Sequence, residues 1–410
     1  MTAASPDTVS GLLREIADVG TDPVRGGYSR PVHSSAETEL REWFVAQASR
    51  RGLDVETDRN GIVWAWHAPG GRRDGAIVTG SHLDSVPGGG AYDGPLGVAS
   101  ALVAFDRLAE RADLHGAADR PRAIAVFPEE EGSRFGVACL GSRLLAGAID
   151  PDRARALTDA DGETFADVTA RAGLDPAGLG PDPDALARID TFVELHVEQG
   201  RGLVDLDRPI AVASSILGHG RWRVSVEGEG NHAGSTLMAD RRDPMVAAAR
   251  LVVRVRELAS RVPDARATVG RLLPTPGGTN VIASRVDLWL DVRHPDDATT
   301  NGLVEEIRQA ALLCAAEEGC TARMTEESLS PTVDFDARLR DDLAAALDAP
   351  VLSTGAGHDA GVLKDHVRTA MLFVRNPTGV SHSPAEDVED ADAEAGAEAL
   401  AVALASLLVD

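Results

Sequence analysis

Residues 80–94 read GSHLDSVPGGGAYDG and follow the apolar run Ala76-Ile77-Val78, which predicts a buried strand. The stretch puts His82 at the end of that strand and Asp93 just before a helix-like segment. Imidazole and carboxylate are the N and O ligands that suit Zn, Mn, Ni or Co. Because residues two apart on a strand share a side, Asp84 could accept the second ring N–H of His82. Taken alone, the stretch fits a polar loop with a solvent-facing histidine better, so partners elsewhere are needed.

Three further apolar runs end in residues of the same chemical kind. Residues 123–127 lead into Glu129-Glu130-Glu131, residues 190–195 into His196, and residues 370–374 into a segment with His382. Neighbouring carboxylates repel one another unless a cation or proton intervenes, although an acidic turn in solvent explains the triplet equally well by itself. One pattern at four strands favours a shared site, because ligands gather at the carboxyl ends of strands in α/β sheets.

The candidate ligands are a set of N and O donors that could hold two divalent cations. A dinuclear site needs a carboxylate able to bridge and holds its cations ~3.5–4 Å apart around one activated water. The set comprises His82, Asp93, Glu131, His196 and His382. Adjacent residues of the Glu triplet can serve different partners, one binding a cation while its neighbour transfers a proton.

The order of predicted strands and helices changes between residues 213 and 327. This segment reads as strand, helix, two strands, helix and strand, which is a compact α+β unit of the split βαβ kind. The elements are expected at residues 221–227, 244–258, 267–272, 286–292, 303–317 and 321–324. We therefore predict an α/β domain formed by residues 1–212 and 328–410, with residues 213–327 inserted as a second domain.

Length and charge restrict the partners. A chain of 410 residues is long enough for about two domains. Its formal net charge of -25 disfavours nucleic acid and anionic membranes, so a small-molecule substrate is expected. Three cysteines form no disulfide pattern, and neither a signal peptide nor a run of ~20 apolar residues is evident. These features predict a cytoplasmic protein with no membrane partner.

The chain resembles a known family through nine motifs in the same order. They are GGYSR near residue 26, GSHLDSVPGGGAYDG, EEEGSRF, ELHVEQG, GNHAGS, TNVI, DVR, GAGHDA and SHSPAE. The family is that of the M20 peptidase-like dinuclear amidohydrolases, in the branch of N-carbamoyl-L-amino acid hydrolase, β-ureidopropionase and allantoate amidohydrolase. The resemblance implies a three-layer α/β catalytic domain and a ferredoxin-like insertion that acts as lid and dimerisation domain.

The resemblance also implies a role for each metal-site residue. Asp93 would bridge two divalent cations (Mn, Zn, Ni or Co), with His82 and His196 completing one position and Glu131 and His382 the other. Glu130 would be the general base, and Asp84 would orient His82. The Glu triplet leaves a register of one residue open, so Glu129 remains an alternative base.

Substrate residues follow from the same resemblance. They are Gln199, His232, Asn280 and Arg293, and His358 of the GAGHDA motif is a further candidate. Arg293 would pair with the substrate carboxylate, while His232 and Asn280 would stabilise the developing oxyanion. A homodimer through residues 213–327 is implied, and His232 could act within its own subunit or across the dimer.

The expected reaction is hydrolysis of a non-peptide C–N bond in a ureido or linear amidine acid, such as allantoate or an N-carbamoyl-L-amino acid, with release of ammonia. A dipeptidase or aminoacylase on the same scaffold is the alternative within catalysis, and a non-catalytic metal-binding protein is the alternative outside it. Two departures from the family pattern, Ser235-Thr236-Leu237-Met238 and Arg375-Asn376-Pro377, leave the substrate preference open.

Overall fold

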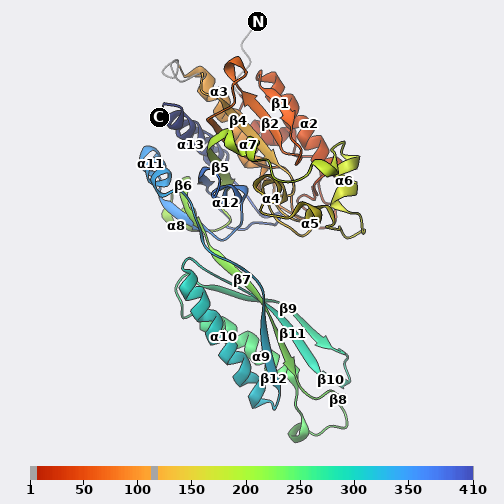
Figure 1. Cartoon of the computed structure of the whole chain (residues 1–410). Helices are drawn as coiled ribbons and strands as arrows, with labels where there is room; N and C mark the ends of the chain where they lie inside the picture. The colour runs from red at the N-terminus through yellow and green to blue at the C-terminus, as the bar shows by residue number, and fades with distance from the viewer. Residues whose placement is uncertain (1–6, 112–118, 410) are drawn as a thin grey trace. The chain divides into compact units, whose positions relative to one another are not determined.

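The computed structural model describes residues 7–111 and 119–409 and divides into two compact units. The larger unit contains the described residues up to Ser214 and those from Asp334 onward, and the smaller unit is Ser215–Val333 (Figure 1). The smaller unit ends beyond the predicted residue 327, because its last strand continues to Ser330.

A nine-stranded mixed sheet forms the centre of the larger unit. The strand order is β1-β2-β4-β3-β5-β15-β6-β13, and β14 pairs with β6. The strands are β1 (Asp54–Thr57), β2 (Val63–His67), β3 (Ala76–His82), β4 (Arg122–Phe127), β5 (Ile189–Val197), β6 (Ile210–Ile216), β13 (Val333–Asp334), β14 (Val351–Thr354) and β15 (Arg368–Val374). Pairs β4/β3, β3/β5 and β5/β15 are parallel, so their carboxyl ends lie along one edge.

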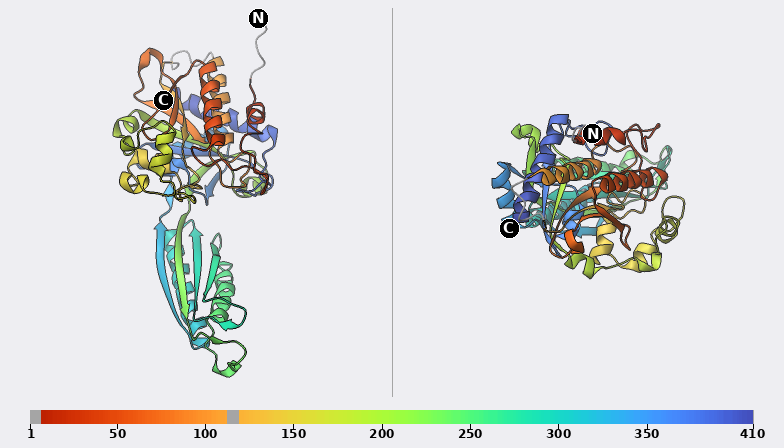
Figure 2. Two further views of the ribbon diagram at one scale, coloured as in Figure 1. Left: turned by 90° about the vertical axis from the view of Figure 1, so that its right-hand side faces the viewer. Right: turned by 90° about the horizontal axis from the view of Figure 1, so that it is seen from above.

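Helices cover both faces of this sheet and complete three layers (Figures 1 and 2). The α-helices are α1 (Val9–Glu15), α2 (Ser35–Arg50), α3 (Pro95–Glu110), α4 (Leu140–Ala146), α5 (Pro151–Arg155), α6 (Phe165–Arg171), α7 (Pro183–Ala187), α8 (Gly202–Leu206), α11 (Ala337–Leu347), α12 (Asp359–Leu363) and α13 (Asp390–Val409). Alternate strand residues such as Val193 and Leu195 enter one core with α3 and α13. Phe192 and His196 belong to the opposite face of the strand and contact Phe127 and His358 there.

Small residues let α3 approach the sheet closely. A Cβ at Gly97 would lie 2.3 Å from the carbonyl oxygen of Leu195, so only glycine fits there. Because α3 begins directly after Asp93 and Gly94, this close packing anchors the end of the GSHLDSVPGGGAYDG stretch against β5.

The smaller unit is a four-stranded antiparallel sheet with two helices on one face. Its elements are β7 (Gly218–Glu227), β8 (Asn231–His232), α9 (Pro244–Ala259), β9 (Arg266–Thr275), β10 (Val281–Ile282), β11 (Arg285–His294), α10 (Asp297–Glu317) and β12 (Thr321–Ser330). On β7, Trp222, Val224 and Val226 pack against the helices, while Arg221 and Arg223 point away. The predicted α/β architecture with an α+β insertion is confirmed.

Two further features concern the whole of the described chain. Cys139, Cys314 and Cys320 are free thiols, and all three are buried. Within residues 7–111 and 119–409, no helix combines the length and the apolar character that spanning a membrane requires.

Candidate metal centre

The five predicted metal ligands come together at the carboxyl ends of the parallel strands. His82 ends β3, and His196 lies at the end of β5. Glu131 follows β4, His382 follows β15, and Asp93 lies between β3 and α3. The chain therefore brings donors that are up to 300 residues apart in sequence, His82 and His382, to one edge of the sheet.

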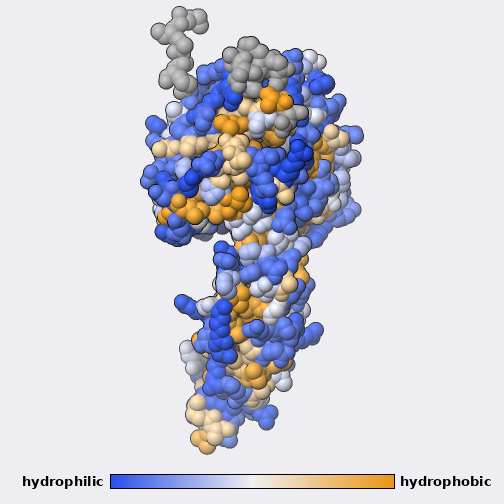
Figure 3. Space-filling view, turned by 90° about the vertical axis from the view of Figure 1, so that its left-hand side faces the viewer, coloured by the Kyte–Doolittle hydropathy of each residue, from blue (hydrophilic) through white to orange (hydrophobic). Residues whose placement is uncertain are grey.

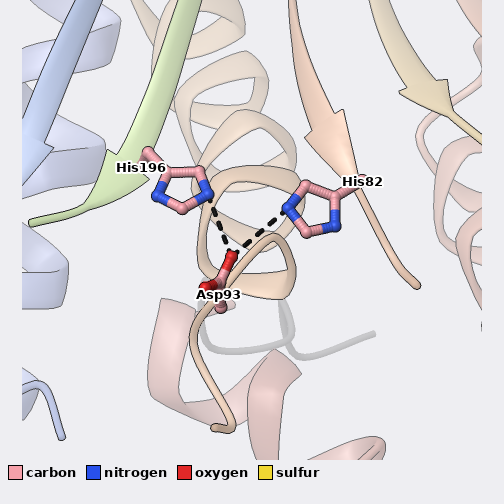
Figure 4. A group of neighbouring side chains, drawn as sticks. All are labelled: His82, Asp93 and His196. Carbon is pink, nitrogen blue, oxygen red and sulfur yellow. Dashed lines mark ion pairs between the residues drawn. The ribbon is translucent and has the colours of Figure 1, made fainter. Parts of the chain in front are cut away.

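The first group of donors is His82, Asp93 and His196 (Figure 4). The Oδ1 atom of Asp93 lies 3.4 Å from Nε2 of His82 and 3.2 Å from Nε2 of His196. Figure 4 shows both rings pointing from neighbouring strands toward this carboxylate. The other ring nitrogens are held by main-chain carbonyls, since Nδ1 lies 3.0 Å from the oxygen of Asp84 in His82 and of Val197 in His196.

The second group is Asp93, Glu131 and His382. Here the opposite carboxylate oxygen, Oδ2 of Asp93, lies 3.5 Å from Nε2 of His382, which is 3.4 Å from Oε2 of Glu131. Asp93 therefore presents one oxygen to each group, which is the geometry of a bridging ligand.

The donor atoms fit two divalent cations. Nε2 of His82 and Nε2 of His196 are buried and have no hydrogen-bond partner among the described residues. Leaving buried polar atoms unpaired costs about 1–3 kcal/mol each, so two such atoms facing one carboxylate indicate a missing partner. Imidazole nitrogens whose second N–H is fixed by a carbonyl are the usual histidine ligands of Zn and related metals.

The electrostatics of the centre also favour bound positive charge. Burial raises the pKa of Glu131 to about 8, and the charge of Asp93 adds to this effect. Burial likewise opposes ionisation of Asp93, but His196 and His82 outweigh it and hold its pKa well below the usual range. Carboxylates crowded in this way lose their mutual repulsion when divalent cations lie between them.

The two groups differ in their exposure to solvent. The side chains of His82 and His196 are 0% and 1% exposed, whereas that of His382 is 51% exposed. His382 also has a positive φ of 54° in the loop that follows β15. One group is therefore enclosed within the protein, and the other opens to solvent on the His382 side.

Asp84 contacts both His82 and the Glu triplet. The ring N–H of His82 is closer to the main-chain carbonyl of Asp84, at 3.0 Å, than to its carboxylate, at 3.5 Å. The carboxylate instead accepts the backbone N–H groups of Glu130 and Glu131, at 3.2 Å each. The carbonyl and the carboxylate of Asp84 thus both lie near the ring, and the orienting role of Asp84 stays a prediction.

The Glu triplet separates its three carboxylates. Oε1 of Glu129 accepts backbone N–H groups from Arg134 and Phe135, at 3.0 and 2.6 Å, and thus closes its own turn. Glu130 instead faces the metal centre, with Oε2 3.7 Å from Nε2 of His82. Its other oxygen, Oε1, accepts from the Cys139 thiol at 3.5 Å. Burial raises the pKa of Glu130 well above its ordinary value, with His82 opposing.

Two of the predicted substrate residues lie beside the metal centre. Nε2 of Gln199 donates to Oδ2 of Asp93 at 2.8 Å and to the Ser381 hydroxyl at 3.1 Å. His358 is buried, its ring centroid 4.4 Å from that of His196 and its Nδ1 3.9 Å from Oε1 of Glu130. Burial and the neighbouring charge of His196 hold the pKa of His358 well below its usual value, so this ring is neutral.

His232 and Asn280 form a pair at one end of the smaller unit. His232 on β8 is opposite Val281 on β10, and the carbonyl of Asn280 accepts the N–H of Ala233 at 3.0 Å. Nδ1 of His232 accepts backbone N–H groups from Gly234 and Ser235. Because Nδ1 is an acceptor, the neutral ring carries its proton on Nε2, which can donate to a ligand.

Arg293 lies at the opposite end of the same unit. It is near the end of β11, whereas Arg285 at the start of β11 adjoins β10. At ~3.4 Å per residue, this strand separates Arg293 from the region of His232 and Asn280 by about 27 Å. Arg293 is also paired with Asp291, through Nε–Oδ1 and Nη2–Oδ2 contacts of 2.7 and 3.0 Å. One copy of the smaller unit therefore cannot offer all three side chains to one small molecule.

Two residues near the centre were not predicted to have a role. The carboxylate of Glu386 accepts the backbone N–H of Asp93, and the hydroxyl of Ser381 lies 3.2 Å from Oδ2 of Asp93. Both belong to the SHSPAE motif, in which only His382 was predicted to have a role. Nothing in the spacing of that motif indicates that Glu386 reaches a residue 293 positions earlier.

Known proteins resemble this chain over nearly its full length. The model of Peptidase family M20/M25/M40 matches residues 78–406. The chain is 34% identical to an N-carbamoyl-L-amino acid amidohydrolase of Geobacillus stearothermophilus, covering 95% of each chain, and 32% identical to an allantoate amidohydrolase of Escherichia coli, covering 97% of each.

A solved structure agrees with these matches. The crystal structure of an amidase of the hydantoinase/carbamoylase family from Burkholderia multivorans has a TM-score of 0.83 and 30% identity, and the match covers 98% of this chain and 97% of that one. Family model, relatives and solved structure all span both units of the chain. This chain belongs to peptidase family M20/M25/M40.

Proposed function

We propose that this protein is a metal-dependent amidohydrolase that cleaves a non-peptide C–N bond of a small ureido or linear amidine acid and releases ammonia. One observation carries the proposal: Asp93 is shared by two groups of metal donors, and the buried carboxylate of Glu130 lies beside them. A protein that only binds metal does not need a buried carboxylate, such as that of Glu130, that belongs to neither donor group. Relatives named N-carbamoyl-L-amino acid and allantoate amidohydrolases support the substrate class.

The residues of the metal centre would then have distinct chemical roles. Two divalent cations (Mn, Zn, Ni or Co) at the two donor groups would lower the pKa of a bound water toward neutrality and polarise the scissile carbonyl. Glu130 takes a proton from the attacking water and delivers it to the leaving nitrogen. Glu129 is a poorer candidate for the base, because Oε1 of its carboxylate closes its own turn through two backbone N–H groups, whereas Glu130 lies beside His82.

A substrate panel tests the proposal. Protein loaded with Mn²⁺, Co²⁺, Ni²⁺ or Zn²⁺ should release ammonia from at least one of allantoate, N-carbamoyl-β-alanine and a series of N-carbamoyl-L-amino acids. A carbamoyl substrate should also yield one amino acid and one carbon dioxide per ammonia. Removing the metal with a chelator should reduce the rate to background, and adding metal back should restore it, because the water loses its activating charge.

The same panel separates the alternatives. Release of free amino acids from dipeptides or N-acyl amino acids, without ammonia, would identify a peptidase or aminoacylase. Full activity after thorough metal removal would contradict the dinuclear mechanism. Metal binding with no turnover of any compound would leave only the non-catalytic interpretation.

For the cellular location we propose the cytoplasm, since three free thiols suit a reducing compartment.

We further propose that the active protein is a homodimer in which each site combines residues of two copies. Arg293 suits a substrate carboxylate, and His232 with Asn280 suits the developing oxyanion. These groups lie about 27 Å apart along one unit, and a small ureido acid cannot span that distance. A second copy of the chain would supply the missing group.

The outer face of the two helices supports an association of this kind. In the smaller unit, α9 and α10 expose apolar side chains, including Val253 at 57% and Leu313 at 65% exposure. A groove along these helices combines them with charged residues such as Arg254 and Glu306. Figure 3 shows apolar surface among hydrophilic surface on this unit. Apolar patches with polar rims are typical of protein interfaces.

Mixed dimers test the composite site. Arg293→Ala and His232→Ala should each be nearly inactive alone, because each removes one substrate contact from every site. Co-expressed with different tags and purified through both, the mixed dimers should recover about half of wild-type activity, since one of their two sites is intact. Ammonia release by the doubly purified protein measures this directly.

Two matched pairings serve as controls. Arg293→Ala with Asn280→Ala should also recover activity, because Asn280 lies beside His232. His232→Ala with Asn280→Ala should not, because both changes fall in the same group. Equal failure of all three pairings would mean that each site draws its substrate groups from one chain.

A further inference from the structure

Glu386 connects the two loops that supply the second donor group. Its Oε1 accepts backbone N–H groups from Tyr92 and Asp93, at 2.9 and 3.0 Å. Its Oε2 lies 3.2 Å from the hydroxyl of Ser381, the residue before His382. The side chain is 5% exposed, so water competes little for these contacts. One carboxylate therefore contacts both the Asp93 loop and the His382 loop.

The Asp93 loop needs restraint from outside. It contains the run Gly88-Gly89-Gly90, and Gly88 and Gly94 have φ values of 76° and 85°. Glycine-rich segments have a large backbone entropy to lose when they are ordered. Tyr28 pairs with Gly89 within the glycine run. Glu386 accepts the backbone N–H groups of Tyr92 and Asp93, which follow the run.

The loop is also shaped to receive this side chain. A Cβ on Gly90 would lie 2.2 Å from Oε1 of Glu386, a distance that no real contact allows. Glycine at position 90 thus admits the carboxylate to the backbone of the loop. Ser381 adds a second link, because its hydroxyl lies 3.2 Å from both Oδ2 of Asp93 and Oε2 of Glu386 and donates to one of them at a time.

Two of the three donors in the first group do not depend on this link. His82 and His196 stand on strands of the central sheet, and carbonyls of the same segments fix their rings. Asp93 and His382 stand on loops, and Glu386 contacts the backbone of one and the neighbour of the other. Loss of Glu386 should therefore disturb the Asp93–His382 geometry most.

We propose that Glu386 is a positioning residue that fixes Asp93 and the His382 loop relative to each other and so determines the affinity of the second metal position. The inference rests on the proposed dinuclear site. Glu386 is a member of neither donor group, and it acts by holding the backbone N–H groups of Asp93 and Tyr92 and the hydroxyl of Ser381.

Titration with Co²⁺ alone tests this inference without an activity assay. Metal-free wild type should bind two equivalents, followed by calorimetry and by the visible spectrum of bound Co²⁺. Glu386→Ala should bind the first equivalent nearly as wild type does and the second about 10- to 100-fold more weakly, the usual range for residues that support a ligand. Glu386→Gln should rescue the second equivalent, because its amide oxygen can accept both N–H groups and its NH₂ can face Ser381.

Glu389→Ala is the matched control, since it removes the same charge from an exposed side chain three residues away. It should bind both equivalents as wild type does, and thermal unfolding of each variant checks that the fold is intact. Wild-type binding of both equivalents by Glu386→Ala would overturn the inference and leave the proposed function standing. So would equal weakening in the Ala and Gln variants, or equal weakening of both equivalents. If wild type binds no Co²⁺, the proposed function and the inference fall together.

Discussion

A Glu130→Gln variant should keep both metal equivalents and lose about 10²- to 10⁴-fold in kcat, the range expected when a general acid–base group is removed. Gln has the shape of Glu but cannot take the proton of the attacking water. Its carboxamide can occupy the same place, with one end near His82 and the other near the Cys139 thiol. Burial, which raises the pKa of Glu130, makes the native carboxylate a stronger base than an exposed glutamate.

The measurement is the rate of ammonia release together with metal content after dialysis. Glu129→Gln serves as the control, because its carboxylate closes a turn through Arg134 and Phe135. That variant should lose thermal stability rather than the chemical step. Near-wild-type turnover in Glu130→Gln, with an inactive but folded Glu129→Gln, would move the base role to Glu129.

Asp93→Ala should empty both metal positions and abolish turnover. Each oxygen of the Asp93 carboxylate faces a different donor group, so one substitution removes a ligand from both. The remaining two donors of each group are too few for tight binding of a first-row metal, which typically needs three protein ligands. Metal analysis after dialysis against metal-free buffer should find less than one equivalent.

His382→Ala is the appropriate comparison. It removes a ligand from the second group alone, so the first equivalent should remain bound. Circular dichroism should show that both variants are folded, since neither residue belongs to a hydrophobic core. Retention of a full equivalent by Asp93→Ala would contradict a bridging role and would make Asp93 a ligand of one position only.

The sequence predicted the main strands and helices because these elements are long and regular. Apolar strands such as β3 and β5 and helices such as α9 have strong periodicity, and their ends fell near the expected residues. The helices α4 to α7 were not predicted. They are only five to seven residues long, which is too short for a clear apolar period. Three of them, α5, α6 and α7, have a side-chain N-cap, as when Asp150 accepts the N–H of Arg153.

Residue types could indicate the ligands of the candidate centre but not the contacts that hold them. Histidines and carboxylates at strand ends pointed to one edge of the sheet, and the structure brings them together there. The turn at Glu129, with a φ of 53°, separates its carboxylate from that of Glu130, and no sequence pattern specifies such a turn. The contact of Glu386 with Asp93 depends on tertiary packing and could not be predicted.

The distance between Arg293 and His232 could have been predicted. The alternating strands on either side of residue 285 were expected, and ten residues of extended chain have a known length. The resemblance grouped Arg293, His232 and Asn280 as substrate residues without regard to that length. A strand of this length places the two groups too far apart for one small substrate, and it therefore favours a site built from two copies.

The unequal exposure of His196 and His382 implies that the two cations exchange with solution at different rates. An ion behind fully enclosed rings leaves only when the surrounding loops open, whereas an ion beside the half-exposed His382 can be reached by water and small chelators directly. Brief contact with a chelator should therefore yield a half-loaded protein before an empty one. The first ion would then stay bound as part of the protein's structure, while occupancy of the second would follow the free metal concentration around it.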